Sequence, residues 1–363
     1  MGLQPSPDEH ELMRLAERAI VRAGFKVASA SILHGIPCFV VEPPVDQKAA
    51  FERLLTYLRP YNLLPTLRRR PEGLVIKVIP FWLRRPGPSL VPLALFLATA
   101  ASIFATGWLL SFGWPEGPFL GALMFLGSMM AILATHEMGH WIAARLHGVS
   151  VSLPYFIPAP PPITPFGTFG AFIRQRSPAP NKDALFDIGI AGPLAGFVAS
   201  VAITFIGLPM SKITIGPVPG AVRLPYIFAY ALVARLVLGP QPEGSSTLLH
   251  PVAFAGWIGM VITMLNLIPA GSLDGGHIAR CVLSAEAQRI LGIAAAICLL
   301  IISMLPPYGG AYVLMAILAL FMALQKHPGP LDDVSELSGA RKAALLLPMA
   351  IFLLCILPLP VPF

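Results

Sequence analysis

The sequence predicts a polytopic α-helical membrane protein of about seven spans, with a re-entrant β-hairpin and a small N-terminal cytosolic α+β domain. The 363 residues are 56% hydrophobic and only 12% charged, with a mean hydropathy of +0.74, whereas soluble domains carry roughly 25% charged residues. Beyond residue 86 the apolar residues gather into long runs, and a membrane helix needs about 20 such residues. The first 85 residues contain no run of this kind.

Residues 1–85 are expected to fold as a two-layer α+β domain with the element order αββαββ. Ser6–Glu9 has the pattern of a capping box with proline at the first helical position, and Asp46 is expected to cap a second helix. This domain has no catalytic constellation, and we expect His10 and His34 to be surface residues. The strands are predicted at residues 26–32, 37–41, 63–70 and 74–79.

Basic residues indicate how the spans are oriented. Arg84 and Arg85 precede the first span, Arg145 ends the second, and such residues mark the cytosolic ends of spans. We therefore expect a multi-pass protein of the cell membrane, with its N-terminus facing the cytosol. Because no apolar signal-peptide segment precedes it, the first span should serve as the insertion signal. The spans are predicted at residues 90–112, 119–145, 183–208, 252–281, 290–305, 311–324 and 343–357.

The basic balance of the chain points to lipid. The net charge is +7, and the Lys and Arg residues lie mostly before residue 86 and beside the hydrophobic runs. This distribution favours contact with the lipid bilayer and its anionic headgroups, and we expect no nucleic-acid partner. The four cysteines show no CxxC spacing, so neither a disulfide framework nor a cysteine-rich zinc site is predicted.

Two histidines and a glutamate interrupt the second span. His136 and His140 are spaced i, i+4, so on a helix their imidazoles project from one face and can bind one metal ion. Glu137 lies close to them and is free to act as a base. Ionisable side chains inside a hydrophobic run are costly and usually functional. The position of this group in a span therefore strengthens the interpretation as a metal site near the cytosolic end of the helix.

Residues 149–176 are apolar but cannot form a helix, because Val151–Pro165 contains six prolines. A glycine-rich, β-like segment follows. The phenylalanines of this region favour a re-entrant hairpin that enters the membrane from the cytosol, and a proline-rich cytosolic linker is the alternative. The β-like segment contains Gly167, Thr168, Phe169 and Gly170.

A catalytic zinc ion takes three protein ligands and keeps one open position, so the two histidines need a partner. Asp274 lies in a span that Asn266, a proline and several glycines interrupt, as in a broken helix whose polar groups are satisfied internally. We predict Asp274 as the third ligand, with His277 as the runner-up; a supporting or interfacial role is favoured for His277. Asp187 is a poorer candidate, because it falls where a span meets the cytosol. For Asp274 to lie at the same depth as the two histidines, residues 209–250 should be an extracytosolic loop with an interfacial or partly inserted helix.

Three motifs in this order resemble the site-2 protease family of intramembrane zinc metalloproteases. They are HExxH, Gly-Pro-x-x-Gly and Asn-x-x-Pro-x-x-x-Leu-Asp-Gly, each in a different span, and the match covers roughly residues 90–282. Two features differ from well-known relatives, since no PDZ domain fits between spans three and four and no CBS pair follows the last span. The resemblance implies one Zn2+ per chain bound by His136, His140 and Asp274, with Glu137 as catalytic base and Asn266 assisting substrate binding.

The resemblance also implies a substrate, namely a transmembrane helix of another membrane protein, cleaved in regulated intramembrane proteolysis. The hairpin in 149–176 would align this substrate, and an exposed edge in Gly167–Ile173 could capture it by strand addition. The predicted division is a domain of unassigned role at 1–85, a catalytic transmembrane core at 86–282 and C-terminal helices at 283–363. The oligomeric state is left open.

Two other classes of protein share some of these features. A membrane transporter with a structural or transported metal also has broken spans and buried His and Asp residues, but it has no need of a glutamate directly after a ligand histidine. An inactive relative that acts as a scaffold would have lost catalytic residues, whereas every expected one is present.

Overall fold

The computed structural model describes residues 9–82, 89–161, 163–216, 220, 224–225, 227–242, 244–304, 311–325 and 327–356. The predicted capping box at Ser6 and the basic pair Arg84 and Arg85 lie outside the described residues.

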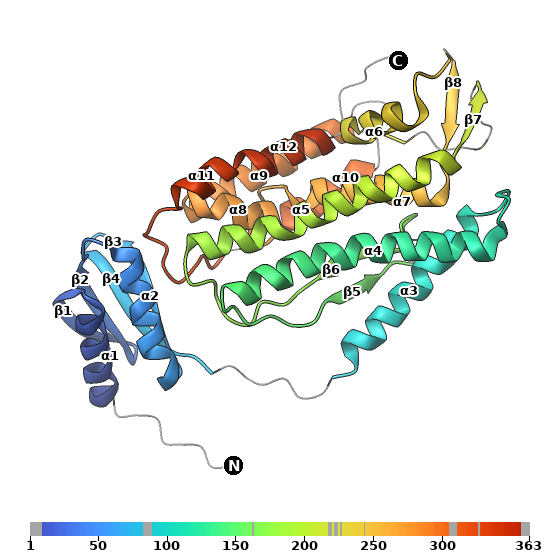
Figure 1. Cartoon of the computed structure of the whole chain (residues 1–363). Helices are drawn as coiled ribbons and strands as arrows, with labels where there is room; N and C mark the ends of the chain where they lie inside the picture. The colour runs from blue at the N-terminus through green and yellow to red at the C-terminus, as the bar shows by residue number, and fades with distance from the viewer. Residues whose placement is uncertain are drawn as a thin grey trace.

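Residues 9–82, called the module below, have the predicted element order αββαββ. The four strands form one antiparallel sheet in the order β1-β2-β4-β3, and two helices pack against it around a core that includes Phe39, Phe51 and Ile76 (Figure 1). Asp46 caps the second helix, as predicted, by accepting a hydrogen bond from the Ala49 N–H. The elements are α1 (Glu9–Ala23), β1 (Lys26–Leu33), β2 (Ile36–Glu42), α2 (Gln47–Leu58), η1 (Arg59–Tyr61), β3 (Leu63–Arg70) and β4 (Gly73–Pro80).

Four described helices are long and apolar enough to cross a membrane, which confirms a multi-pass helical membrane protein. Each corresponds to a predicted span. The last of them begins at Ala285, earlier than the predicted residue 290, because Ser284 caps it. The four are α3 (Val91–Leu110), α4 (Gly117–Leu146), α5 (Lys182–Gly207) continued by η2 (Leu208–Met210), and α9 (Ala285–Ser303).

The other predicted spans fall on shorter helices. The fourth is α7 (Pro251–Asn266) with 16 residues, followed after an irregular stretch by α8 (Asp274–Val282), so the predicted break is confirmed. The sixth is α10 (Ala311–Leu324). The seventh is divided between α11 (Gly339–Ala344) and α12 (Leu346–Cys355).

Two short antiparallel ribbons complete the fold. One pairs β5 (Tyr155–Pro158) with β6 (Thr168–Phe172), inside the segment where the hairpin was predicted. The other pairs β7 (Lys212–Ile215) with β8 (Ser245–Leu248) on either side of α6 (Phe228–Leu238). The sequence analysis missed this second ribbon, because each strand has four residues and a long insertion separates them, so no local pattern announces the pairing.

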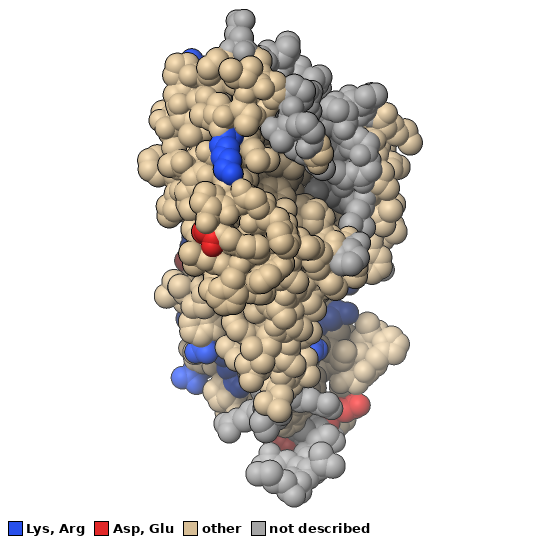
Figure 2. Space-filling model, turned by 90° about the vertical axis from the view of Figure 1, so that its right-hand side faces the viewer, with Lys and Arg blue, Asp and Glu red and all other residues tan. Residues whose placement is uncertain are grey.

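The module and the β7–β8 ribbon lie at opposite ends of the helical bundle (Figure 1). Viewed from the ribbon end, the molecule shows few charged side chains (Figure 2). At the beginning of α4 and of α7, Glu116 Oε1 lies 2.5 Å from His250 Nε2. This contact joins the starts of two helices whose other ends carry predicted site residues.

Candidate metal centre

The predicted ligands meet at one point. His136 and His140 lie on α4, and Asp274 is the first residue of α8. The Asp274 carboxylate oxygens lie 3.3 Å from His136 Nε2 and 3.2 Å from His140 Nε2, and the two Nε2 atoms are 3.2 Å apart. Both histidines are 6% exposed. Two helices far apart in the sequence thus bring three metal-binding side chains together in the bundle interior.

The donor atoms of these side chains are arranged so that they can bind one cation between them. The His140 Nδ1 atom lies 2.7 Å from the Ile188 carbonyl oxygen, and donation to that oxygen places the ring proton on Nδ1 and a lone pair on Nε2. This lone pair faces the Asp274 carboxylate. A tetrahedral zinc ion with bonds of about 2.0–2.1 Å separates its ligand atoms by about 3.3 Å. The separations of 3.2–3.3 Å between the ligand atoms match this value, so the three residues fit zinc.

Helix α5 approaches the two histidines closely. A Cβ atom at Gly196 would lie 2.8 Å from His136 Nδ1, and one at Gly192 would overlap the His140 imidazole. A Cβ atom at Gly139 would overlap the backbone of Ala191. The small residues of the Gly-Pro-x-x-Gly motif thus allow the close helix approach that the sequence predicts.

A Gly192→Ala substitution is expected to weaken zinc binding about 10-fold or more, because the new methyl group would displace the ligand ring of His140. The measurement is a zinc titration against a chromophoric chelator. Gly127→Ala on α4 is the matched control, because a Cβ atom there meets nothing within 4 Å and alanine stabilises a helix by about 0.5–1 kcal/mol. Equal zinc affinities of the two variants would contradict the close contact.

Glu137 is buried beside the ligands and is 3% exposed. Its Oε2 atom has no hydrogen-bond partner among the described residues, and the backbone of Ile173, which follows β6, lies near the carboxylate. A buried carboxylate oxygen without a partner is costly and needs an explanation. A role of Glu137 as a proton acceptor would explain it, because the partner of this oxygen would then be present only when water and substrate are bound.

Two further predicted residues lie near the ligands. Asn266 is the last residue of α7, and its Nδ2 atom lies 3.2 Å from His136 Nε2. His277 follows Asp274 on α8, but its Nδ1 atom lies 2.6 Å from His327 Nε2. The group of three converging ligands contains Asp274 and not His277.

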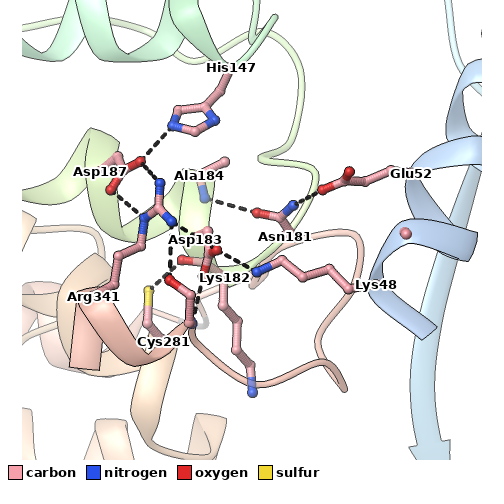
Figure 3. Close-up of polar contacts among 12 residues, drawn as sticks. Lys48, Glu52, His147, Asn181, Lys182, Asp183, Ala184, Asp187, Cys281 and Arg341 are labelled. Atoms are coloured by element: carbon pink, nitrogen blue, oxygen red, sulfur yellow. Dashed lines mark hydrogen bonds and ion pairs between the residues drawn. The ribbon is translucent and has the colours of Figure 1, made fainter. Parts of the chain in front are cut away.

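Asp187 lies near the start of α5 and binds other partners. Its carboxylate accepts hydrogen bonds of 2.7 and 2.5 Å from the Arg341 guanidinium and lies 2.8 Å from His147 Nε2 (Figure 3). These contacts tie α5 to the end of α4 and to α11, and they leave no role for Asp187 in the ligand group.

The predicted hairpin residues have different surroundings. Thr168 is buried, and its hydroxyl donates a 2.8 Å hydrogen bond to the Ile157 carbonyl. Gly167 has a φ of 77°. It packs closely on α3, so that a Cβ atom at position 167 would lie 2.7 Å from the Cα atom of Ile103. Gly170 has a φ of 103°, next to the irregularity in strand pairing. Phe169 is 53% exposed, so it is free to contact lipid or another chain.

Sequence reasoning missed two contacts that support the ligands. The Ile188 carbonyl oxygen carries no side-chain signal. His327 follows His277 by fifty residues, and no pattern in the sequence sets these two histidines apart from the other four that lie outside the HExxH motif.

An HExxH helix and a distant aspartate that converge inside a membrane bundle define the class of membrane-embedded metallopeptidases. The chain belongs to peptidase family M50, because the profile described as "Peptidase family M50" matches residues 124–305. The matched region contains both histidines, Glu137 and Asp274. The resemblance to site-2 proteases is thereby confirmed, and the His136, His140 and Asp274 site is a zinc site in a family whose members are named zinc metalloproteases.

Curated relatives are similar over about two thirds of the chain. "Probable zinc metalloprotease EGY1, chloroplastic" of Oryza sativa subsp. japonica is 33% identical over 254 residues, which are 67% of this chain and 42% of the relative. The protein of the same name from Arabidopsis thaliana is 32% identical over 66% of this chain and 44% of the relative. "Probable zinc metalloprotease EGY2, chloroplastic" of Arabidopsis thaliana is 33% identical over 64% and 40%. The chain therefore spans less than half the length of these relatives. No solved structure matches it significantly.

Proposed function

We propose that this protein is an intramembrane zinc metalloprotease that hydrolyses a peptide bond within or near a transmembrane helix of another membrane protein. The observation that carries the proposal is the position of the Asp274 carboxylate, 3.2–3.3 Å from both ligand histidines. A glutamate with a free carboxylate oxygen stands on the same helix. This is the set of groups that metal-assisted hydrolysis requires.

His136, His140 and Asp274 would hold the zinc ion. When bound, zinc supplies Lewis-acid polarisation of the scissile carbonyl and makes water nucleophilic near neutral pH. Glu137 accepts a proton from the attacking water and passes it to the leaving amine. Asn266 donates hydrogen bonds beside His136, where it can hold a substrate carbonyl.

The hairpin would present the substrate in an extended form, because the peptide bonds of a helix are shielded by its own hydrogen bonds. Among the residues that the structure describes, β6 pairs with β5 alone, so its second edge is a candidate for strand addition. The exposed rings of Phe169 and Phe172 supply apolar contacts for a transmembrane segment. The proximity of Ile173 to Glu137 supports a path from this edge to the catalytic base.

For the whole chain we propose the seven-span topology, with the shorter helices α7, α10 and α12 completing the crossings and the hairpin re-entering the membrane. The division at residues 85 and 282 and the cytosolic orientation of the N-terminus and site belong to the same proposal. A cell-membrane location stays a prediction, because the names of the relatives above include the word chloroplastic.

The deciding experiment measures zinc content and cleavage of a transmembrane reporter by the purified protein in detergent. We expect about one zinc ion per chain, loss of cleavage on treatment with a chelator, and recovery when zinc is added back. A protein that holds zinc and never cleaves any transmembrane reporter would support a scaffold or a transporter instead. Cleavage that survives complete zinc removal would refute the metalloprotease mechanism.

A further inference from the structure

The helix that carries Asp274 cannot position this residue by itself. α8 has nine residues, and helices this short are unstable in isolation. Irregular backbone separates it from α7, and its C-terminal end does not continue into α9. The position of the third ligand therefore depends on the tertiary contacts of α8.

Two polar side chains of α8 contact one segment of the chain, residues 327–335, called the strap below. His277 Nδ1 lies 2.6 Å from His327 Nε2. Burial, together with nearby His277 and Arg280, lowers the pKa of His327 to about 3, so this ring is neutral and the contact is a hydrogen bond. Arg280, 6% exposed, forms an ion pair with Asp333. The strap thus holds α8 at two positions, three residues apart.

The strap is in turn bound to the module. Leu331 is 4% exposed and belongs to the hydrophobic core of the module. The Leu67 N–H on edge strand β3 donates to the Leu331 carbonyl at 2.9 Å, and the Asp333 N–H donates to the Leu67 carbonyl at 3.2 Å. Arg68 donates to the Leu331 carbonyl at 2.7 Å and lies 3.9 Å from the Asp333 carboxylate. The strap therefore extends the sheet of the module by one short parallel segment.

One carboxylate joins the module to the metal-bearing helix. Asp333 is paired with Arg68 of β3 and with Arg280 of α8, and the three side chains are 14%, 28% and 7% exposed respectively. Charges with this little exposure depend on their partners. Removal of Asp333 leaves two arginines without their shared carboxylate, and removal of Arg68 leaves Asp333 with one partner in place of two. A displacement of β3 would therefore be transmitted to Arg280, and through α8 to Asp274.

A second set of contacts joins the module to the start of α5. Lys48 on α2 forms an ion pair with Asp183 of α5, and Glu52 accepts a 2.9 Å hydrogen bond from the Asn181 side chain (Figure 3). These residues lie at the start of the helix whose glycines pack against the ligand histidines. The module thus contacts the supports of all three ligands.

We propose that the module is a positioning element for the metal centre, and that Arg68, Asp333 and Arg280 act as positioning residues for Asp274. The proposal rests on the proposed function only in that it takes Asp274 as a zinc ligand. It assigns a role to the N-terminal domain, for which the sequence offered none.

The test compares zinc dissociation constants of full-length variants in detergent, by competition with a chromophoric chelator. Arg68→Gln and Asp333→Asn are each expected to weaken zinc binding about 10- to 100-fold, the range for residues that orient metal ligands from outside the coordination sphere. Arg68→Lys, which keeps the charge but loses the forked geometry, should give an intermediate value. Lys26→Met is the matched control, because the Lys26–Glu42 pair is exposed and Lys26 lies on β1, the edge strand opposite β3.

A readout at saturating zinc separates positioning from general stability. Cleavage by Arg68→Gln should return towards the wild-type rate when zinc is in excess, and the melting temperature of the zinc-free variant should stay close to that of the zinc-free Lys26→Met control. If Arg68→Gln does not fold, Asp333→Asn, which preserves side-chain volume, takes its place. Zinc affinities within twofold of the Lys26→Met control would overturn the proposal.

The two proposals fail in different ways. A wild-type protein that cleaves nothing, with zinc affinities that still follow the predicted order, would refute proteolysis and keep the positioning role. A wild-type protein that cleaves, with strap variants that bind zinc normally, would keep proteolysis and refute the positioning role.

Discussion

A Glu137→Gln variant is expected to bind zinc as the wild type does and to lose proteolysis by a factor of about 10²–10⁴ or more, the contribution of a positioned general base. Glu137 is buried and one of its oxygens has no partner in the described part of the chain, so an amide of the same shape fits the site but cannot accept the proton. The measurement pairs metal content with cleavage of a transmembrane reporter.

Glu116→Gln is the matched control for this variant. Glu116 immediately precedes the same helix and pairs with His250, so the same chemical change is made far along α4 from the ligands. We expect the control to keep cleavage at a rate near that of the wild type. Normal cleavage by Glu137→Gln would rule out the catalytic role of this residue.

An Asp274→Ala variant should lose its zinc. Only two imidazoles then remain, whereas a catalytic zinc site needs three protein ligands. The variant also lacks the carboxylate that lies 3.2–3.3 Å from both imidazoles, which is the negatively charged ligand of the three. Zinc content after dialysis should fall from about one ion per chain to a small fraction, and cleavage should fall with it.

Asp46→Ala provides the control for the loss of a carboxylate. Asp46 caps α2 in the module, and removal of such a cap costs about 1 kcal/mol of stability. This variant should melt at a lower temperature and keep its zinc. Retention of tightly bound zinc by Asp274→Ala would show that another group serves as the third ligand.

Local signals made the module predictable. Asp46 marks where the second helix begins. His34 and Gly35, both of which have positive φ, form the two-residue turn at which β1 reverses into β2. The β7–β8 ribbon was not predictable in this way, because residues distant in the sequence form it.

The same distinction between local and long-range signals applies to the residues of the metal centre. His136, Glu137 and His140 follow from a five-residue pattern within one helix, since helical periodicity alone places the histidines on one face. Asp274 was identified from the interrupted helix around it, which indicates a functional segment without specifying a distance to α4. Only the tertiary structure shows that Asp274 contacts both imidazoles.

The sequence by itself determined the membrane class of this protein, the α+β module and the identity of the metal-binding side chains, because hydropathy, caps and helical spacing act over a few neighbouring residues. The tertiary structure alone decided that Leu331 completes the core of the module and that Asp333 is shared between Arg68 and Arg280. These contacts join residues more than fifty positions apart in the chain, and such pairings depend on how preformed elements pack, not on the periodicity of any one of them.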